Sequence, residues 1–268
     1  FNGGGAFMPG YSGSGGGGFS IGVGIGGGFS GGAGGGFGVG GETDISRMTA
    51  GLPIGYFHGY QTDGIFQTQS EVNAHATQTN AAPGDIRFVD TNEDGVINDA
   101  DRTNLGDPIA DITMGLNLSA NYKNFDFSAY AFASIGNDIV RNYERNLALT
   151  NKPAWYLDRW RGPGTSNSSP RVTTGATGNT AFSDFYVEDG SFVRLQNVQV
   201  GYSMDPNLFG KSGIDKLRFY FSANNLVTLT KYKGYDPAAT NGAAIGGGID
   251  QGFYPTPKTF IFGLNVNF

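Results

Sequence analysis

A strict alternation of apolar and polar residues is the strongest pattern along the chain. In residues 112–122, ITMGLNLSANY, every second position from Ile112 to Tyr122 is apolar, and the positions between them are small or polar. Successive side chains of a β-strand point to opposite faces, so this pattern predicts a strand with one apolar and one polar face. Its length is close to the roughly 9–11 residues that a tilted strand needs to cross a membrane.

Three further segments repeat the alternation within the chain. Residues 125–135 follow a short turn at Lys123 and Asn124, and we expect them to form a hairpin with the preceding strand. Strands are also expected at 191–203 and 217–231.

The last segment, 258–268, alternates in the same way. Its even-numbered residues from Phe260 to Phe268 are all apolar, and Ile261 is the exception on the other face. An apolar face for lipid and a polar face for a lumen are what a membrane-spanning strand requires. The aromatic end at Phe268 resembles the signal by which bacterial outer-membrane barrels are recognised for insertion. The alternative is an edge strand of a soluble sheet.

Connections of very different length separate these segments. The long polar stretches 136–190 and 233–257 alternate with short turns. Loops of this length are uncommon in compact soluble domains, but they are typical of the outward-facing side of a membrane barrel. The predicted fold class is therefore all-β: the carboxyl-terminal strands of a large transmembrane antiparallel β-barrel with long extracellular loops.

Residues 1–41 differ from the rest of the chain because they are of low complexity and about half of them are Gly. One interpretation is a flexible linker or loop, since such a tract buries too little surface to offset its backbone entropy. Another is a Gly-rich strand with aromatic anchors. The predicted organisation is this Gly-rich segment followed by a barrel part at 42–268.

Composition excludes several functional classes. The formal net charge is −6 and no cluster of Lys and Arg is visible, which argues against nucleic acid as a partner. The chain has no Cys, so disulfides and thiolate metal sites are excluded. No apolar run reaches the 18 residues or so of a transmembrane helix. The chain opens without a signal peptide, at Phe1, which suggests a mature product or a fragment.

Residues 90–101, DTNEDGVINDAD, match a calcium-binding loop of the EF-hand type. Hard cations prefer oxygen ligands, and a Gly at the sixth position, here Gly95, permits the sharp turn. Asp101 takes the place of the usual Glu at the twelfth position. The alternative is an acidic loop of Asx turns without an ion. The predicted ligands of a structural Ca²⁺ are Asp90, Asn92, Asp94, the backbone carbonyl of Val96, Asn98 and Asp101.

Catalytic motifs are missing. Neither His58 nor His75 has a Ser or acidic partner at triad spacing, and no nucleophile-elbow motif occurs. The sequence therefore predicts a protein that is not an enzyme. The cluster at 158–161, DRWR, could contact a sugar or peptide, but packing within a loop is the favoured interpretation. The favoured role of Tyr232, Tyr235 and Tyr254 is that of membrane-interface aromatics.

Six collinear segments between residues 42 and 268 resemble the final third of SusC/RagA-type TonB-dependent transporters of Bacteroidetes. They are 51–66 (GLPIGYFHGYQTDGIF), 84–107 (GDIRFVDTNEDGVINDADRTNLGD), 122–127 (YKNFDF), 189–202 (DGSFVRLQNVQVGY), 224–236 (NNLVTLTKYKGYD) and 249–268 (IDQGFYPTPKTFIFGLNVNF). The acidic loop at 90–101 also matches a calcium-like loop of that family. The tract 1–41 and the segment RGPG at 161–164 depart from the family pattern.

The resemblance implies a barrel of about 22 strands around a plug, located in the outer membrane. It further implies a SusD-like surface lipoprotein that captures glycan or peptide, and energy supplied by TonB through the plug. A chain of this length holds roughly six strands, so we expect part of a longer protein surrounded by outer-membrane lipid. The competing hypothesis is a calcium-stabilised, secreted or surface-adhesive β protein.

Overall fold

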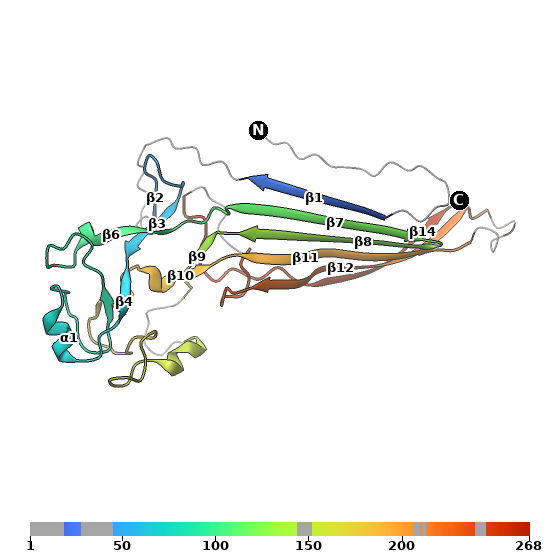
Figure 1. Cartoon of the computed structure of the whole chain (residues 1–268). Helices are drawn as coiled ribbons and strands as arrows, with labels where there is room; N and C mark the ends of the chain where they lie inside the picture. Colours follow the sequence, from blue (N-terminus) through green and yellow to red (C-terminus); the bar gives the residue numbers. More distant parts are fainter. Residues whose placement is uncertain (1–18, 28–44, 144–151, 206–209, 211–212, 239–244) are drawn as a thin grey trace.

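A six-stranded antiparallel sheet forms the long axis of the molecule (Figure 1). The computed structural model describes residues 19–27, 45–143, 152–205, 210, 213–238 and 245–268. The strands lie side by side in the order in which they follow one another along the chain, as in a meander. They are β1 (Phe19–Gly27), β7 (Ile112–Tyr122), β8 (Phe125–Ile135), β11 (Phe192–Ser203), β12 (Lys216–Thr230) and β14 (Thr259–Asn267).

The register places the apolar positions of neighbouring strands on one face of this sheet. One cross-strand row joins Phe127 to Val200, Phe221 and Phe262. The next rows on the same face, two residues away along each strand, are also apolar. The opposite face carries residues such as Asp126 of β8 and Gln199 of β11. The alternation in the sequence therefore becomes a two-faced sheet, as predicted. A register shift between Leu195 and Asn197 keeps this division on both sides of the bulge.

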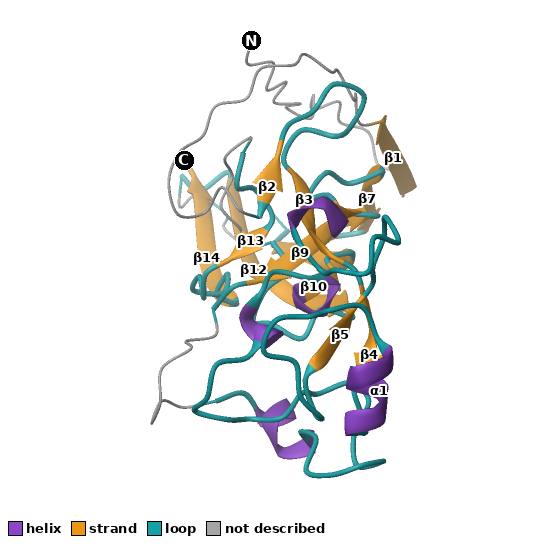
Figure 2. Ribbon diagram, turned by 90° about the vertical axis from the view of Figure 1, so that its left-hand side faces the viewer, coloured by secondary structure: helices purple, strands orange, loops and turns teal. Residues whose placement is uncertain are grey.

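Three long connections join β1 to β7, β8 to β11 and β12 to β14. They leave the sheet at the same end, where they form a compact loop region, and the short turn between β7 and β8 lies at the other end (Figure 1). The loop region holds three small sheets and short helices (Figure 2). Its elements are β2 (Ser46–Arg47), β3 (Tyr56–Tyr60), β4 (Thr62–Ile65), α1 (Gln69–Ala74), β5 (Ile86–Phe88), η1 (Asp99–Asp101), β6 (Arg102–Gly106), β9 (Asp138–Arg141), η2 (Ala154–Asp158), η3 (Gly178–Thr180), η4 (Asp184–Tyr186), β10 (Val187–Asp189) and β13 (Ile249–Asp250).

A small apolar core holds the loop region together. Phe57 of β3, Val140 of β9 and Ile249 of β13 are at most 1% exposed and pack against one another. Each comes from a different long connection, so segments far apart in the sequence share this core. β9 pairs with β10 on one side and with β13 on the other, and the pairing with β13 is parallel.

The strands of the large sheet agree closely with the sequence prediction, and the bounds of β7 and β8 are those expected. The Gly-rich tract gives a different result from the linker interpretation, because residues 19–27 form β1 and pair with β7. Its register sets Ile21 opposite Leu118 and Val23 opposite Leu116, so the few apolar residues of this segment follow the same period of two. The rest of 1–41 lies outside the described residues. In the described part of the chain, no helix is long and apolar enough to cross a membrane.

Candidate functional site

The acidic loop 90–101 folds back on itself through its own side chains. Asp90 Oδ2 accepts the backbone N–H of Gly95 at 2.8 Å, which closes the sharp turn expected at the sixth position. Asp94 Oδ2 accepts Asn92 Nδ2 at 3.0 Å and Asn98 Nδ2 at 3.4 Å. The backbone carbonyl of Val96 accepts Asn98 Nδ2 at 3.1 Å. The predicted ligands are thus neighbours within one tight loop.

The Asp101 carboxylate stabilises the backbone of this loop. Its carboxylate is fully buried and accepts the backbone N–H groups of Thr91 at 2.9 Å and Asn98 at 2.8 Å. Burial alone raises the pKa of Asp101, but the N–H groups of Asn98, Thr91 and Asn92 outweigh burial, so its pKa lies below the ordinary value. The carboxylate is therefore charged at neutral pH and held facing the backbone.

One oxygen of the loop has no partner: Asp90 Oδ1 is buried and accepts no hydrogen bond. An unpaired buried carboxylate oxygen is costly, and a cation would satisfy it. The oxygen-rich residues at 90–101 fit a hard cation such as Ca²⁺ by type. Across the described residues, however, no group of three or more His, Cys, Asp or Glu side chains is arranged to hold a metal ion. Asn side chains and a backbone carbonyl make up the rest of the predicted ligand set.

The polar face of the large sheet carries an ion pair that spans three strands. Arg218 of β12 donates to Asp126 of β8, with 2.9 Å between Nε and Oδ1. β11 lies between these two strands, and its residue at this level is Gly201. A side chain at Gly201 would overlap both charged groups, so the missing side chain is what lets the pair form. Similarly, the Tyr220 ring lies over Gly263.

A second ion pair fastens the 233–257 loop to the same face. Arg194 of β11 pairs with Asp236, and the side chains are 6% and 4% exposed. The backbone N–H groups of Ala238 and Thr256 also donate to Asp236, each at 2.9 Å. Burial raises the pKa of Asp236, but these N–H groups and the guanidinium of Arg194 lower it further than burial raises it. We call Arg194, Asp236 and Thr256 the loop clasp.

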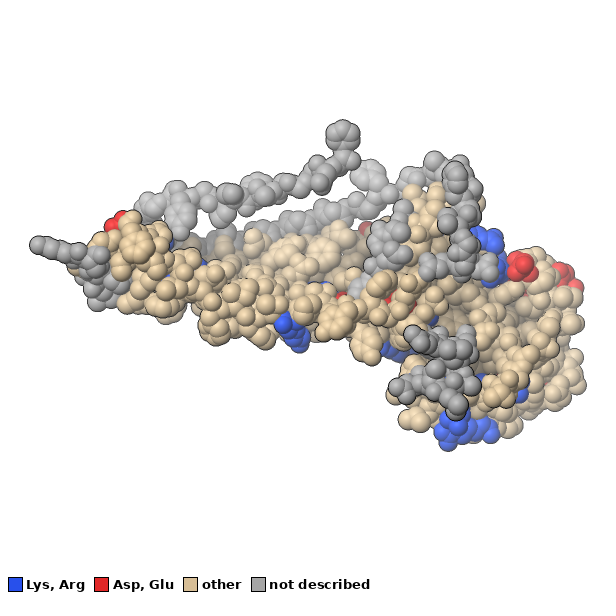
Figure 3. Space-filling model, turned by 180° about the vertical axis from the view of Figure 1, so that it is seen from behind, with Lys and Arg blue, Asp and Glu red and all other residues tan. Residues whose placement is uncertain are grey.

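A third ion pair lies inside the loop region. Arg141 of β9 forms an ion pair with Glu188 of β10, with 2.8 Å between Nη1 and Oε1. Its guanidinium lies over the rings of Trp155 and Phe185, each at 5.2 Å from the ring centroid. These three ion pairs give their six charged side chains partners within the described polar face and loop region. Figure 3 shows most of the visible charged side chains over the loop region and a long sheet that is largely uncharged.

Acidic groups gather where the loop region meets the sheet. Asp138 is partly buried, and burial together with the nearby carboxylates of Asp107, Asp189 and Asp111 raises its pKa. A raised pKa means that the folded state favours the protonated form, so the contribution of Asp138 to stability is greatest below its ordinary pKa and is lost as the pH rises through the folded-state pKa.

We therefore predict that Asp138→Asn stabilises the junction at neutral pH. The Asn side-chain oxygen can still accept the N–H of Asp107, which lies 3.3 Å from Asp138 Oδ2, and the unfavourable charge is removed. Hydrogen exchange of the β9 and β10 amides, corrected for intrinsic rates, should be slower in the variant at pH 7. The difference should shrink toward pH 4, and equal rates at pH 7 would contradict the prediction.

Other residues singled out in the sequence have packing roles. His58 and His75 hydrogen-bond through ring nitrogens to the backbone carbonyls of Thr103 and Phe88, at 3.2 and 2.8 Å. Trp160 of the 158–161 cluster donates from Nε1 to Gln67 Oε1 at 3.1 Å, which supports packing within the loop.

The prediction of an interface aromatic is wrong for Tyr232. This residue is 6% exposed and donates to Asp250 Oδ2 at 2.6 Å, which holds β13 in place. Tyr235 and Tyr254 are highly exposed in the loop region, at 78% and 87%. The loop clasp and the Asp126–Arg218 pair were not anticipated. An Arg at a polar position inside an alternating strand could have indicated that Arg194 and Arg218 have acidic partners, but not which residues these are.

Comparison with known proteins identifies the group to which this architecture is similar. The chain is 36% identical over 237 residues to TonB-dependent receptor P3 of Formosa agariphila, a match that covers 85% of the chain and 23% of the receptor. It is 31% identical over 192 residues to TonB-dependent receptor SusC of Bacteroides thetaiotaomicron, covering 70% of the chain and 18% of SusC. The chain is homologous to part of a SusC-type TonB-dependent receptor. No protein-family model matches it.

Solved structures give the same result for the fold of this receptor homologue. The RagAB peptide importer in its open-open state superposes with a TM-score of 0.63 at 25% identity, covering 82% of the chain and 23% of the importer chain. The closed-closed state gives a TM-score of 0.61, also at 25% identity. The chain thus spans about a fifth to a quarter of the length of the proteins it matches. Its relatives are outer-membrane proteins, and the sheet of this SusC homologue is part of an outer-membrane barrel wall.

Proposed function

We propose that the chain is the wall segment of an outer-membrane receptor that imports nutrients with energy delivered through TonB. The observation that carries the proposal is the two-faced six-stranded sheet with all long connections at one end. In this proposal the apolar face meets lipid, the polar face lines the passage, and the loop region faces outward. Residues 42–268 belong to the barrel part, to which β1 adds a strand. The chain has no catalytic role.

The partners follow from the same proposal. A SusD-like surface lipoprotein would cover the outer opening and deliver glycan or peptide, and TonB would act on the plug of the receptor. The similarity to SusC and to the RagAB peptide importer supports both partners. The net charge of −6 argues against nucleic acid as a partner.

Deletion of the gene and affinity purification test this function together. We expect the deletion strain to lose growth on one class of glycan or peptide supplied as sole nutrient, and wild-type growth to return on complementation. A tagged receptor extracted in detergent should retain a surface lipoprotein. A protein that is soluble without detergent, retains no lipoprotein and supports no uptake would favour the alternative of a secreted or adhesive β protein.

We also propose that the acidic loop binds a structural Ca²⁺ through Asp90, Asn92, Asp94, Asn98, Asp101 and the carbonyl of Val96. The unpaired Oδ1 of Asp90 supports this proposal. The ion would supply positive charge among three carboxylates. The loop also pairs through its backbone with Thr77, whose N–H donates to the Gly95 carbonyl at 2.8 Å. A bound ion would therefore stiffen the segment that follows α1 as well.

Calcium titration of the purified receptor tests this site. At affinities of about 10⁻⁴ to 10⁻³ M, typical of extracellular modules, millimolar Ca²⁺ should slow hydrogen exchange in residues 90–101. Asp90→Asn should weaken this effect, because it removes the charge of the carboxylate whose Oδ1 accepts no hydrogen bond. Asp63→Asn is the matched control, since Asp63 is an exposed carboxylate outside the loop. Exchange that is insensitive to Ca²⁺ in the wild-type protein would overturn the proposal.

A further inference from the structure

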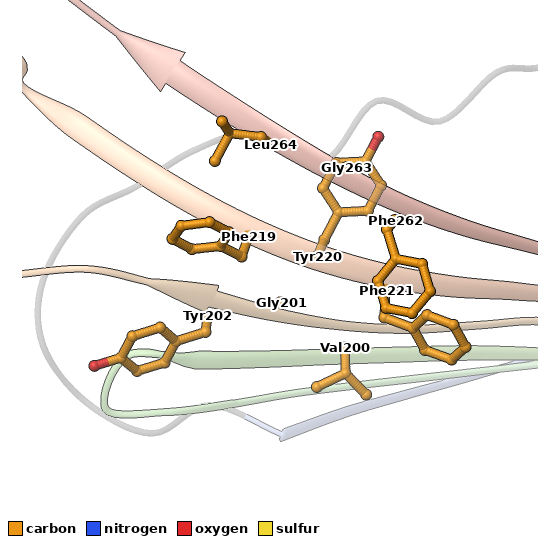
Figure 4. A pocket seen from close by; sticks show the side chains of 9 residues that line it. All are labelled: Val200, Gly201, Tyr202, Phe219, Tyr220, Phe221, Phe262, Gly263 and Leu264. Atoms are coloured by element: carbon orange, nitrogen blue, oxygen red, sulfur yellow. The ribbon is translucent and has the colours of Figure 1, made fainter.

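A depression of about 510 Å³ lies on the apolar face of the large sheet, across β11, β12 and β14 (Figure 4). Six side chains of the apolar face line it: Val200, Tyr202, Phe219, Phe221, Phe262 and Leu264. The Phe221 and Phe262 rings, with centroids 4.8 Å apart, form one side of it. The volume is within the range of roughly 300–1,000 Å³ that holds a small organic ligand. We call this depression the lipid-side groove.

Its chemistry restricts what can occupy it. No charged side chain lines the groove, and most of its lining is aromatic or aliphatic, so an apolar group fits it better than an ion does. The protein itself leaves Val200 and Phe219 41% and 48% exposed. Both lie on the face that is turned to the membrane, so membrane lipid is what covers them. Because a membrane surrounds this face with hydrocarbon chains, the apolar molecule at hand is a lipid tail.

The position of the groove along the strands indicates which part of the lipid lies there. β12 begins at Lys216, and the groove residues Phe219 and Phe221 follow three to five residues later, or roughly 10–17 Å along the strand. Tyr202 and Phe125, with ring centroids 4.8 Å apart, mark the end of the sheet where the β7–β8 turn lies. Aromatic rings prefer the level of the head groups. A head group at that level would send its tail into the groove.

We propose that the lipid-side groove holds one acyl chain of a phospholipid from the leaflet at the turn end of the sheet, as a bound lipid distinct from the mobile lipid around it. The proposal rests on the membrane position of the sheet and is independent of what the receptor transports. A filled groove would also support the last three strands of the sheet from outside.

Two variants on the same strand provide the test. Val200→Trp fills the groove, and Val193→Trp places the same ring on the same face of β11 outside it. Val193 is a matched control because it is 42% exposed, against 41% for Val200. The complete receptor would be purified from outer membranes in a mild detergent and weighed by native mass spectrometry. Heat-induced mobility shifts on gels would confirm that both variants are folded.

We expect one retained phospholipid per receptor in the wild-type protein and in Val193→Trp, and its loss in Val200→Trp. A phosphatidylethanolamine with a diazirine in its acyl chain should crosslink to peptides containing 200–202, 219–221 or 262–264, and the crosslink should disappear in Val200→Trp. Equal lipid retention in all three proteins, or no retention in any, would overturn the proposal. So would a folded Val200→Trp that changes only the number of receptor copies in the complex, because the groove would then belong to a contact between copies.

Discussion

Arg194→Ala is expected to release the 233–257 loop from the sheet. The substitution leaves the Asp236 carboxylate buried beside the N–H groups of Ala238 and Thr256 but without its guanidinium. Removing one partner of a buried ion pair costs about 3–5 kcal/mol. Hydrogen exchange in residues 233–238 and 245–257 should therefore accelerate by about 100-fold to a few thousand-fold, since each 1.4 kcal/mol or so is a factor of ten.

The exposed pair of Arg87 and Asp63 is the control for this expectation. Their side chains are 30% and 71% exposed, although Nη2 and Oδ2 are only 2.6 Å apart. Solvent screens such pairs, and they contribute about 0–1 kcal/mol. Arg87→Ala should change exchange rates little. If Arg194→Ala were as mild as Arg87→Ala, the loop would be held by its apolar core and the clasp would be incidental.

Gly201→Ala is expected to weaken the barrel wall through the polar face. A methyl group at this position would overlap Arg218 Nη2 and both carboxylate oxygens of Asp126. Overpacking costs about 1–3 kcal/mol, and the displaced ion pair adds to that loss. The temperature at which the purified receptor loses its folded mobility on gels should fall clearly below that of the wild-type protein.

Gly115→Ala on β7 is the matched substitution. It adds the same methyl group to the same face, but the nearest atom, Tyr130 Oη, is 3.2 Å away at the end of a side chain that can move. We expect a smaller fall in unfolding temperature. In an Asp126→Ala background the cost of Gly201→Ala should shrink, because the carboxylate that the methyl group overlaps is gone. An undiminished cost would assign the effect to Arg218 or to the strand backbone and not to Asp126.

The large sheet was predictable because the alternation of apolar and polar residues within each strand is enough to define its two faces. The alternation in 112–122 needs no partner to be recognised, and its two ends became the ends of β7. The Gly-rich segment was harder to predict, since Gly offers no side chain to define a face and only Phe19, Ile21, Val23 and Ile25 carry the period in β1. Its strand character became visible only once β7 supplied a register for it.

The candidate sites also differ in whether their residues are close together in the sequence. The acidic loop is a local motif, and the structure brings its residues together as neighbours in sequence. The role of Asp101 as an acceptor of backbone N–H groups was not predicted, because an EF-hand comparison assigns that position to the ion. The clasp depends on Arg194 and Asp236, which are 42 residues apart, and no local pattern joins them. Pairs of this kind require the topology first.

The shared core of the loop region has a practical consequence for exchanging parts between related receptors. Phe57, Val140 and Ile249 come from three separate connections, yet each fills space that the other two leave. A single transplanted connection would bring its own apolar residue into a core whose other two residues come from a different receptor. The result would be either a cavity or a steric clash. Chimaeras built to alter what a receptor of this type accepts should therefore move the three connections as one cassette.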